Sequence, residues 1–323
     1  MILKNKKSIL FLSLSSLFLL FGCTDKESDK DKDNNTDYAL VESTSESNLN
    51  NYNEYVNLES ILNAGYAVEN YLNDYNLNWW SYKVDGVNSL LLSDKKGSYY
   101  SNNSDVNYYG VRIGDNSQSV KKLLGEPLEY YKKGNNLYDI KSEEYYSYEI
   151  EGNYVTYFFD NVEGDVVKNV LIIPVSTENS KDGYYNEDSG SETYISSLEN
   201  LMVELINSDR RNNGLKELIY DKTLNSTARN HSQDMINNNY FAHENLKGES
   251  VKDRMIADGF RGYSLYGENI AYGQFNSIYA HEALMNSEGH RKNILEERYS
   301  HVGVGVAINS DNLPYFTINF YSK

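Results

Sequence analysis

The last 129 residues of the chain change from a helical to a strand-like hydrophobic pattern. Apolar residues recur at helical spacing in four stretches, which begin near residues 196, 222, 250 and 277. Alternation with a period of two follows in Val302–Ile308 and in Phe316–Phe320, and Asn309–Asn312 joins these runs as a hairpin turn. Helices followed by paired strands predict an α/β sandwich with an antiparallel sheet over residues 195–323.

Residues 99–175 carry the pattern of a second, smaller unit. Gly114-Asp115 opens a helix with Val120 and Leu124 on one face, Gly125 ends it, and Pro127 prevents its continuation. Three strand-like stretches follow at Tyr145–Ile150, Tyr154–Phe159 and Val166–Ile173. One helix and several strands predict a small α+β domain, so the fold class expected for the whole chain is α+β.

The remaining segments show weaker patterns. Residues 24–50 are polar and charged and cannot bury enough surface to offset their ordering entropy, so they predict a disordered tether. Residues 51–98 predict a small helical segment, because Tyr55, Leu58 and Ile61 keep helical spacing and Trp79-Trp80 suggests a buried anchor. Residues 176–194 are polar with glycine and serine and predict a linker.

The N-terminus has the organisation of an export signal. Three lysines among the first seven residues precede an uncharged apolar run over residues 8–22. This run is shorter than the roughly 20 residues that a stable membrane span needs, and a basic start is typical of secretory signals. Leu20-Phe21-Gly22-Cys23 resembles a bacterial lipoprotein cleavage site, so residues 1–23 are expected to be the signal peptide with Cys23 as the lipidated residue.

The cysteine count and the charge support this localisation and limit the partners. Cys23 is the only cysteine of 323 residues, so an exported chain would have no disulfide framework, and lipidation would consume its one thiol. The alternative is cleavage and full release. The formal net charge of −17 argues against nucleic-acid binding, which needs a basic face. We therefore expect an exported protein, held by lipid at the outer face of the cell membrane.

Four fragments in residues 195–323 carry a family resemblance when they are taken in order. They are Tyr240–His243, Gly267–Ala271, Ser287–Leu295 and Val302–Val306. Together they resemble the CAP superfamily of cysteine-rich secretory proteins, antigen 5 and pathogenesis-related proteins, in its bacterial, disulfide-free (SCP-like) branch. The resemblance implies a C-terminal α-β-α sandwich with a wide cleft. The pattern from Gly114 to Pro127 resembles the N-terminal module found beside CAP domains in Gram-positive bacteria.

The resemblance also implies the residues of the cleft, where the family has two histidines and two acids. By motif, His243 matches the first histidine, Glu268 the first glutamate and His290 the second histidine. The second glutamate is missing, because alignment on Gly289-His290 puts Ser287 at that position. Asn269, Arg291 and Asn293 lie within the same motifs and are expected to support the cleft.

Three roles are open to this set of residues, two catalytic and one structural. His243 and His290 with a carboxylate could bind zinc and leave a position for water, with Glu268 as the base. Without metal, Ser287 could act as nucleophile with His290 as its base. In a structural role, Glu268 and Asn269 would satisfy loop amides and His290 would cap a turn.

Three other histidines are not expected to be ligands. His281 begins a motif like H-E-x-x-H, but Met285 occupies the place of the second histidine. His281 lies on the apolar side of its helix, so it is interpreted as packing. His231 shares an apolar stripe and fits the core or the cleft wall, and His301 opens a strand.

The sequence therefore favours a surface lipoprotein that binds a ligand through its CAP cleft. The ligand classes open to it are a wall component, a lipid or a protein partner, and no cofactor is required, although zinc is one option. CAP relatives act more often by binding than by turnover, which the resemblance implies, and the acid missing at Ser287 favours the same interpretation. The alternatives are an envelope hydrolase acting on peptide or peptidoglycan with zinc or Ser287, and a non-catalytic spacer.

Overall fold

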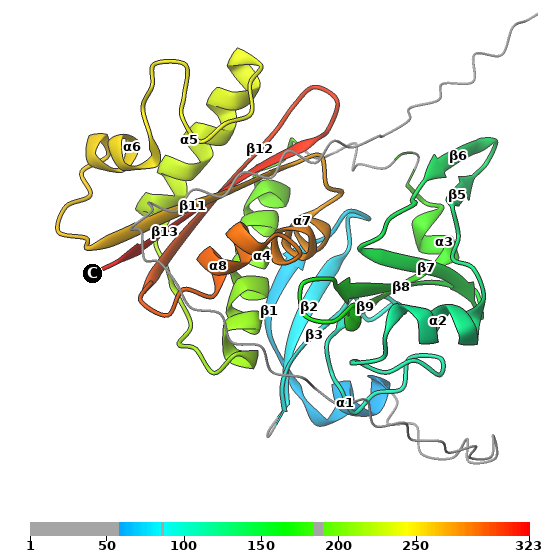
Figure 1. The fold of residues 1–323 in the computed structure, drawn as a ribbon. Helices are drawn as coiled ribbons and strands as arrows, with labels where there is room; N and C mark the ends of the chain where they lie inside the picture. Colours follow the sequence, from blue (N-terminus) through cyan, green and yellow to red (C-terminus); the bar gives the residue numbers. More distant parts are fainter. Residues whose placement is uncertain (1–57, 85–86, 182, 184–189) are drawn as a thin grey trace, which may run out of the picture.

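Two sheets organise the chain in the computed structural model, which describes residues 58–84, 87–181, 183 and 190–323 (Figure 1). The first is antiparallel, with the strand order β1-β2-β3-β4-β9-β8-β7, and the second has the order β10-β12-β13-β11. In the second sheet β10 runs parallel to β12, whereas β13 is antiparallel to both β12 and β11. The predicted signal peptide with Cys23 and the tether lie outside the described residues.

The N-terminal domain is built on the seven-stranded sheet, with a separate hairpin formed by β5 and β6. Its elements are α1 (Leu58–Ala64), β1 (Tyr66–Leu72), β2 (Asn78–Val84), β3 (Val87–Ser93), β4 (Tyr99–Ser101), α2 (Ser117–Leu124), β5 (Tyr130–Lys133), β6 (Asn136–Asp139), β7 (Tyr145–Ile150), β8 (Asn153–Asp160), β9 (Val166–Pro174) and α3 (Val175–Glu178).

The prediction of a separate helical segment over residues 51–98 is wrong beyond one short helix. Helix α1 accounts for the helical spacing, and the residues after it form β1, β2 and β3. Tyrosine and tryptophan fit the pleated, half-buried surface of a sheet, and Trp79 is buried on β2. Because β3 pairs with β4 and β4 with β9, strands β1 to β3 belong to the same sheet as β7, β8 and β9.

The helix and the three strands predicted within residues 99–175 are confirmed. Asn116 caps α2 by accepting a hydrogen bond from the Ser119 amide at 2.9 Å. Gly125 ends the helix with a φ of +85°, in the region that favours glycine. The predicted strands correspond to β7, β8 and β9.

The segment between the domains is shorter than the predicted linker over residues 176–194. Helix α3 continues to Glu178, and α4 begins at Glu192 with Ser191 as its N-cap. The side chain of Ser191 accepts a hydrogen bond from the Tyr194 amide, which starts the helix three residues before the expected domain boundary.

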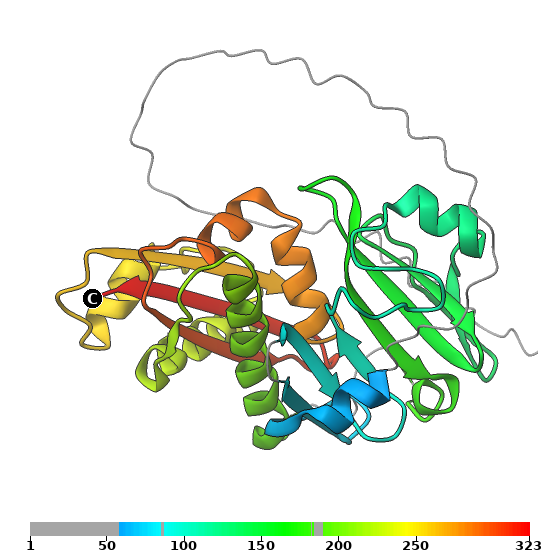
Figure 2. The same cartoon turned by 90° about the horizontal axis from the view of Figure 1, so that it is seen from below.

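The C-terminal domain is the expected α-β-α sandwich. Helices α4, α7 and α8 cover one face of the four-stranded sheet, and α5 and α6 cover the other (Figures 1 and 2). Its elements are α4 (Glu192–Asn212), β10 (Ile219–Tyr220), α5 (Lys222–Asn238), α6 (Val251–Ala257), β11 (Leu265–Tyr272), α7 (Ser277–Met285), α8 (Glu288–Ile294), β12 (His301–Ile308) and β13 (Pro314–Ser322).

Glycines explain how closely α5 packs on the sheet. A Cβ atom at Gly305 would collide with the backbone of Ala228 and Arg229, and one at Gly303 would collide with the backbone after Leu224. The alternating Val-Gly pattern of β12 therefore has two functions. Its valines fill the core on the α4 side, and its glycines let the α5 backbone approach on the other side.

Helix α4 is buried on two sides and joins the domains (Figure 2). Leu198, Met202 and Ile206 enter the core of the C-terminal sandwich. Leu201 and Leu205 point to the N-terminal sheet and form an interdomain core with Ile278 of α7. The residues of the N-terminal domain in this core are Tyr71, Trp79, Leu90, Leu92, Tyr100, Phe158, Leu171 and Ile173.

Buried polar groups also cross this interface. The Tyr100 hydroxyl donates to Glu282 Oε1 at 2.6 Å, and Lys168 lies 3.2 Å from Asp209 of α4. Burial raises the pKa of the Glu282 carboxyl to about 8, and the nearby Asp209 and Asp160 add to this, while the Lys168 ammonium and the Tyr100 hydroxyl oppose it. Glu282 is therefore protonated in the folded protein at neutral pH.

We predict that Glu282→Gln changes how stability depends on pH. The folded protein holds a proton on Glu282 up to about pH 8, whereas the unfolded chain releases it near pH 4.5. The wild-type free energy of unfolding therefore falls between these values, by at most about 1.4 kcal/mol per pH unit from this group. Urea unfolding at pH 5, 7 and 9 should show the variant gaining stability relative to wild type as pH rises. Parallel profiles for the two proteins would contradict the assignment.

Candidate functional site

The first pair of predicted cleft residues is joined by a hydrogen bond. Glu268 lies on β11 and is 3 % exposed, and His243 lies in the loop after α5 with 15 % of its side chain exposed. His243 Nδ1 is 2.9 Å from Glu268 Oε1. An ionised carboxylate only accepts, so this contact assigns the proton to Nδ1.

Arg254 of α6 completes this group and was not found by the sequence analysis. Its Nη2 donates to Glu268 Oε2 at 2.6 Å, and its Nη1 donates to the His243 carbonyl at 2.8 Å. Burial alone would raise the pKa of the Glu268 carboxyl, but the His243 hydrogen bond and the Arg254 charge lower it below its ordinary value. Glu268 is thus ionised, with one oxygen on each partner.

The second pair lies at the start of α8. Ser287 occupies the N-cap position of this helix without making a side-chain capping bond, and its Oγ is 2.7 Å from His290 Nδ1. His290 is fully buried. A serine hydroxyl bonded to an imidazole is the first element of a nucleophile–base arrangement.

Two asparagines connect the pairs through the backbone. Asn269 Nδ2 donates to the His290 carbonyl at 3.0 Å, and Asn293 Nδ2 donates to the Glu268 carbonyl at 3.2 Å and to Asn269 Oδ1 at 2.8 Å. A Cβ atom at Gly267 would collide with the Tyr299 hydroxyl beside this network. The Gly-Glu-Asn and His-Arg-x-Asn motifs therefore hold β11 against α8, which places Glu268 and His290 on adjacent elements.

Arg291 acts on the site from outside it, through the N-terminal domain. Its guanidinium reaches the N-terminal domain, where Nη1 and Nη2 bind the Asp160 carboxylate at 3.0 and 2.8 Å. Asn286, one residue before Ser287, donates to the Phe159 carbonyl and accepts from the Asn161 amide, both at 2.9 Å. The turn after β8 thus holds the segment that carries Ser287 and His290.

We predict that Asp160→Asn destabilises the protein by about 3–5 kcal/mol, because it removes the buried carboxylate that pairs with the Arg291 guanidinium and leaves only the exposed Glu163 beside it. The asparagine keeps an acceptor for the Val162 and Glu163 amides, which Asp160 Oδ1 now binds, so the turn itself is preserved. Chemical unfolding measures the loss. Glu163→Gln is the control, since Glu163 lies 3.1 Å from Arg291 but is 66 % exposed, and we expect about 0–1 kcal/mol there. Equal effects of the two substitutions would contradict this role for Asp160.

The residues that could hold zinc do not form a three-ligand set. Both oxygens of Glu268 are engaged, and one of them faces the Arg254 cation, which disfavours a metal there. Within the described ranges, no group of three or more histidine, cysteine, aspartate or glutamate side chains has a metal-binding arrangement. A catalytic zinc uses three protein ligands, so the arrangement does not fit a resident zinc.

The other three histidines make packing contacts outside the two pairs. His281 is buried 3.4 Å from Asp209, and burial lowers its pKa to about 4, so it is neutral. His231 is buried on α5, with Nε2 3.0 Å from the Ala242 carbonyl, behind the loop that carries His243. His301 begins β12 and stacks on the ring of Tyr321.

Arg254 could not have been recognised from its motif. It follows the helix start at Ser250, where a basic residue on a short helix has no distinctive spacing relative to Glu268. Only the packing of α6 beside β11 brings its guanidinium to the carboxylate. Asp160 is similar, since it lies 131 positions from its partner Arg291.

Comparison with known families agrees with this architecture. Residues 203–320 match the model of the cysteine-rich secretory protein family, CAP, and residues 57–184 match the CAP-associated N-terminal family. The second match begins close to α1, as the continuous seven-stranded sheet requires. The chain belongs to the CAP family and carries the CAP-associated domain before its CAP domain.

Two similar proteins and one similar solved structure come from Bacillus species. The chain is 30 % identical over 280 residues to the "uncharacterized membrane protein YlbC" of Bacillus subtilis (strain 168), which covers 77 % of this chain and 76 % of that protein. It is 44 % identical over 120 residues to YkwD of the same strain, which covers 37 % of this chain and 46 % of that protein. A crystal structure of an extracellular protein containing an SCP domain from Bacillus anthracis str. Ames has a TM-score of 0.67 at 23 % identity, and the match covers 88 % of this chain and all of that one. This last likeness shows the fold.

The helices were also compared with the length and apolarity that a membrane span requires. Among residues 58–84, 87–181 and 190–323, no helix meets both requirements.

Proposed function

We propose that this protein is exported, is held at the outer face of the cell membrane by lipid on Cys23, and binds a ligand through its CAP cleft. The cleft is built around His243, Glu268, Ser287 and His290. Its ligand is a wall component, a lipid or a protein partner. Nucleic acid is not the partner, since the chain has a formal net charge of −17.

One observation favours ligand binding over catalysis. Glu268 gives one oxygen to His243 and the other to Arg254, and its pKa lies below the ordinary value. A general base at neutral pH works best with a pKa near the working pH, and Glu268 is shifted the other way. Instead, the carboxylate orients the imidazole of His243, and in this proposal His243 is the group that contacts the ligand.

The relatives support the localisation at a coarser level. One relative is named a membrane protein, and the similar solved structure is described as an extracellular protein. The basic start, the apolar run and Cys23 in this chain add the specific form of anchoring that we propose.

We predict that His243→Ala weakens binding to the ligand by about 5- to 150-fold, because loss of one hydrogen-bonding group that meets a ligand costs about 1–3 kcal/mol. The measurement is co-sedimentation of residues 24–323 with purified cell-wall sacculi, and separately with vesicles of anionic phospholipid. His301→Ala is the matched control, a histidine on β12 that lies outside the two pairs.

The outcome separates binding from the spacer alternative. Binding that is lost in His243→Ala and retained in His301→Ala supports the cleft. Sedimentation that is identical in all three proteins would count against the cleft and in favour of a non-catalytic spacer.

The hydrolase alternative has one observation in its favour, the 2.7 Å contact between Ser287 Oγ and His290 Nδ1. It requires release of soluble fragments from the same sacculi, abolished in Ser287→Ala. Its zinc form requires stoichiometric Zn²⁺ uptake in calorimetry that is lost in the His243→Ala/His290→Ala protein. If neither occurs, the hydrolase alternative fails and the binding proposal stands.

We predict that Cys23→Ser releases the protein from the membrane. The wild-type chain, expressed in a Gram-positive host, should incorporate labelled palmitate and enter the detergent phase on Triton X-114 partitioning, because several acyl chains hold a protein firmly. The variant should lose the label and enter the aqueous phase. Since Cys23 is the only cysteine, labelling that persists in the variant would contradict this anchor.

A further inference from the structure

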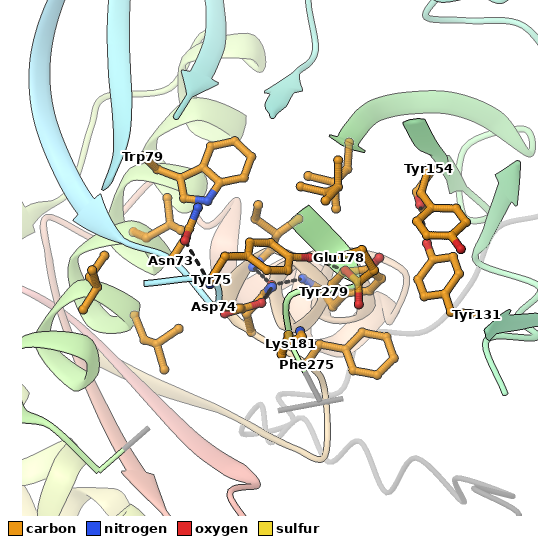
Figure 3. A pocket seen from close by; sticks show the side chains of 18 residues that line it. Asn73, Asp74, Tyr75, Trp79, Tyr131, Tyr154, Glu178, Lys181, Phe275 and Tyr279 are labelled. Atoms are coloured by element: carbon orange, nitrogen blue, oxygen red, sulfur yellow. Dashed lines mark hydrogen bonds between the residues drawn. The ribbon is translucent and has the colours of Figure 1, made fainter. Parts of the chain in front are cut away.

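A pocket lies between the two domains, and its lining includes no residue of the two pairs (Figure 3). The turn after β1 and the strands β2, β8 and β9 contribute to it from the N-terminal domain, and α4 and the start of α7 contribute from the CAP domain. Its cavity volume is about 50 Å³. One water needs roughly 10–15 Å³ on such a scale, and a benzene-binding cavity has about 150 Å³, so this pocket fits a group of a few non-hydrogen atoms.

A buried amide donor in this pocket has no partner among the described residues. Asn73 is 7 % exposed, and its Nδ2 makes no hydrogen bond there. Its orientation is fixed, because Oδ1 accepts from the backbone amides of Tyr75 and Leu77, both at 3.0 Å. If the amide were flipped, its NH₂ group would face these two backbone N–H donors, and neither hydrogen bond could form. Nδ2 is therefore the atom that lacks a hydrogen bond. Buried donors are nearly always hydrogen-bonded, so this one indicates that a ligand supplies the acceptor.

The charged groups of the pocket are balanced within the protein. Asp74 accepts from the Tyr194 hydroxyl and from Asn276 Nδ2. Glu178 accepts from the Tyr75 hydroxyl and pairs with Lys133. Burial alone would raise the pKa of Glu178, but the ammonium groups of Lys181 and Lys133 lower it, so it is ionised. Both carboxylates therefore already have partners within the protein, and an additional charge on a ligand would be unpaired.

The walls define the remainder of the ligand. The aliphatic side chains of Leu171, Ile173, Leu201 and Ile278 line the pocket and belong to the interdomain core. The half-buried rings of Tyr75, Phe275 and Tyr279 also line it. Small-molecule sites commonly combine such apolar walls with a few polar groups, and they occur preferentially between domains.

We propose that this interdomain pocket binds a neutral, short acyl group, with its carbonyl oxygen on Asn73 Nδ2 and its alkyl end against the aliphatic wall. The carbonyl satisfies the lining donor that has no partner among the described residues, and two to four carbons match the available volume. The carbonyl comes from an amide or from an ester, which share this chemistry. The site is independent of the function proposed for the cleft.

The test uses ¹⁹F NMR of residues 24–323 labelled with 5-fluorotryptophan. The chain has two tryptophans, so two signals are expected, and a Trp80→Phe protein assigns them. Trp79 lines the pocket, whereas Trp80 lies under Lys95, 4.4 Å from its ring centre, and does not line it. N-methylacetamide and methyl acetate, which are small enough for the cavity, should shift the Trp79 signal saturably and leave the Trp80 signal in place.

Two charged analogues and a pair of variants give the controls. In the same titration, propionate and propylammonium should bind at least about tenfold more weakly than the neutral probes. Asn73→Asp removes the donor but keeps acceptors for the Tyr75 and Leu77 amides, and it should weaken binding of the amide by about tenfold. Asn76→Asp adds the same charge at an exposed position nearby and should bind as wild type does. Whether the amide or the ester binds more tightly identifies the source of the acyl group.

Three results would overturn the proposal. They are the absence of a saturable Trp79 shift with either neutral probe, equal shifts with propionate, and unchanged binding in a folded Asn73→Asp protein. If Asn73→Asp does not fold, Ile173→Phe, which fills the pocket, replaces it, and undiminished binding there has the same meaning. His243→Ala/His290→Ala should bind the probes normally, so failure of the cleft proposal and failure of this one are distinguishable.

Discussion

The burial of helix α4 on two sides is the constraint on which the rest of this structure depends. One side supplies Leu198, Met202 and Ile206 to the sandwich core, and the other supplies Leu201 and Leu205 to the interdomain core. A helix with two apolar faces cannot leave either one exposed without losing the free energy of that burial. The N-terminal sheet is therefore a structural part of the CAP domain's surroundings, and the two family regions meet through a packed interface.

The same interface reaches the second pair of predicted site residues. The turn after β8 binds Asn286 and Arg291, which flank Ser287 and His290. From the other side, Arg210 of α4 donates to the carbonyls of Ile294 and Glu296 at the end of α8. Helix α8 has only seven residues and would be marginal alone, so its position depends on these contacts. The geometry of the second pair is thus set by groups outside the pair, in both domains.

Local patterns predicted most of the CAP domain because local physics determines them there. Asp221 and Ser250 cap α5 and α6, which begin where the hydrophobic pattern predicts, and the alternation of β12 and β13 around Asn309–Asn312 forms the hairpin. The prediction failed over residues 51–98, where short stretches rich in aromatic residues fit a helix or a strand by spacing alone. Strand pairing decided between the two, since β3 pairs with β4 and β4 pairs with β9.

The sequence by itself determined the family, the sandwich of the C-terminal domain and the four residues assigned to the cleft, because these follow from motifs and periodicities that are short along the chain. Only the tertiary structure decided the partners of those residues. It joined Glu268 to Arg254 and Arg291 to Asp160, and it left Asn73 with an unpaired donor between the domains. The physical reason is that a buried charge or amide is satisfied by whichever group packing brings within hydrogen-bond distance, and sequence separation does not encode that distance.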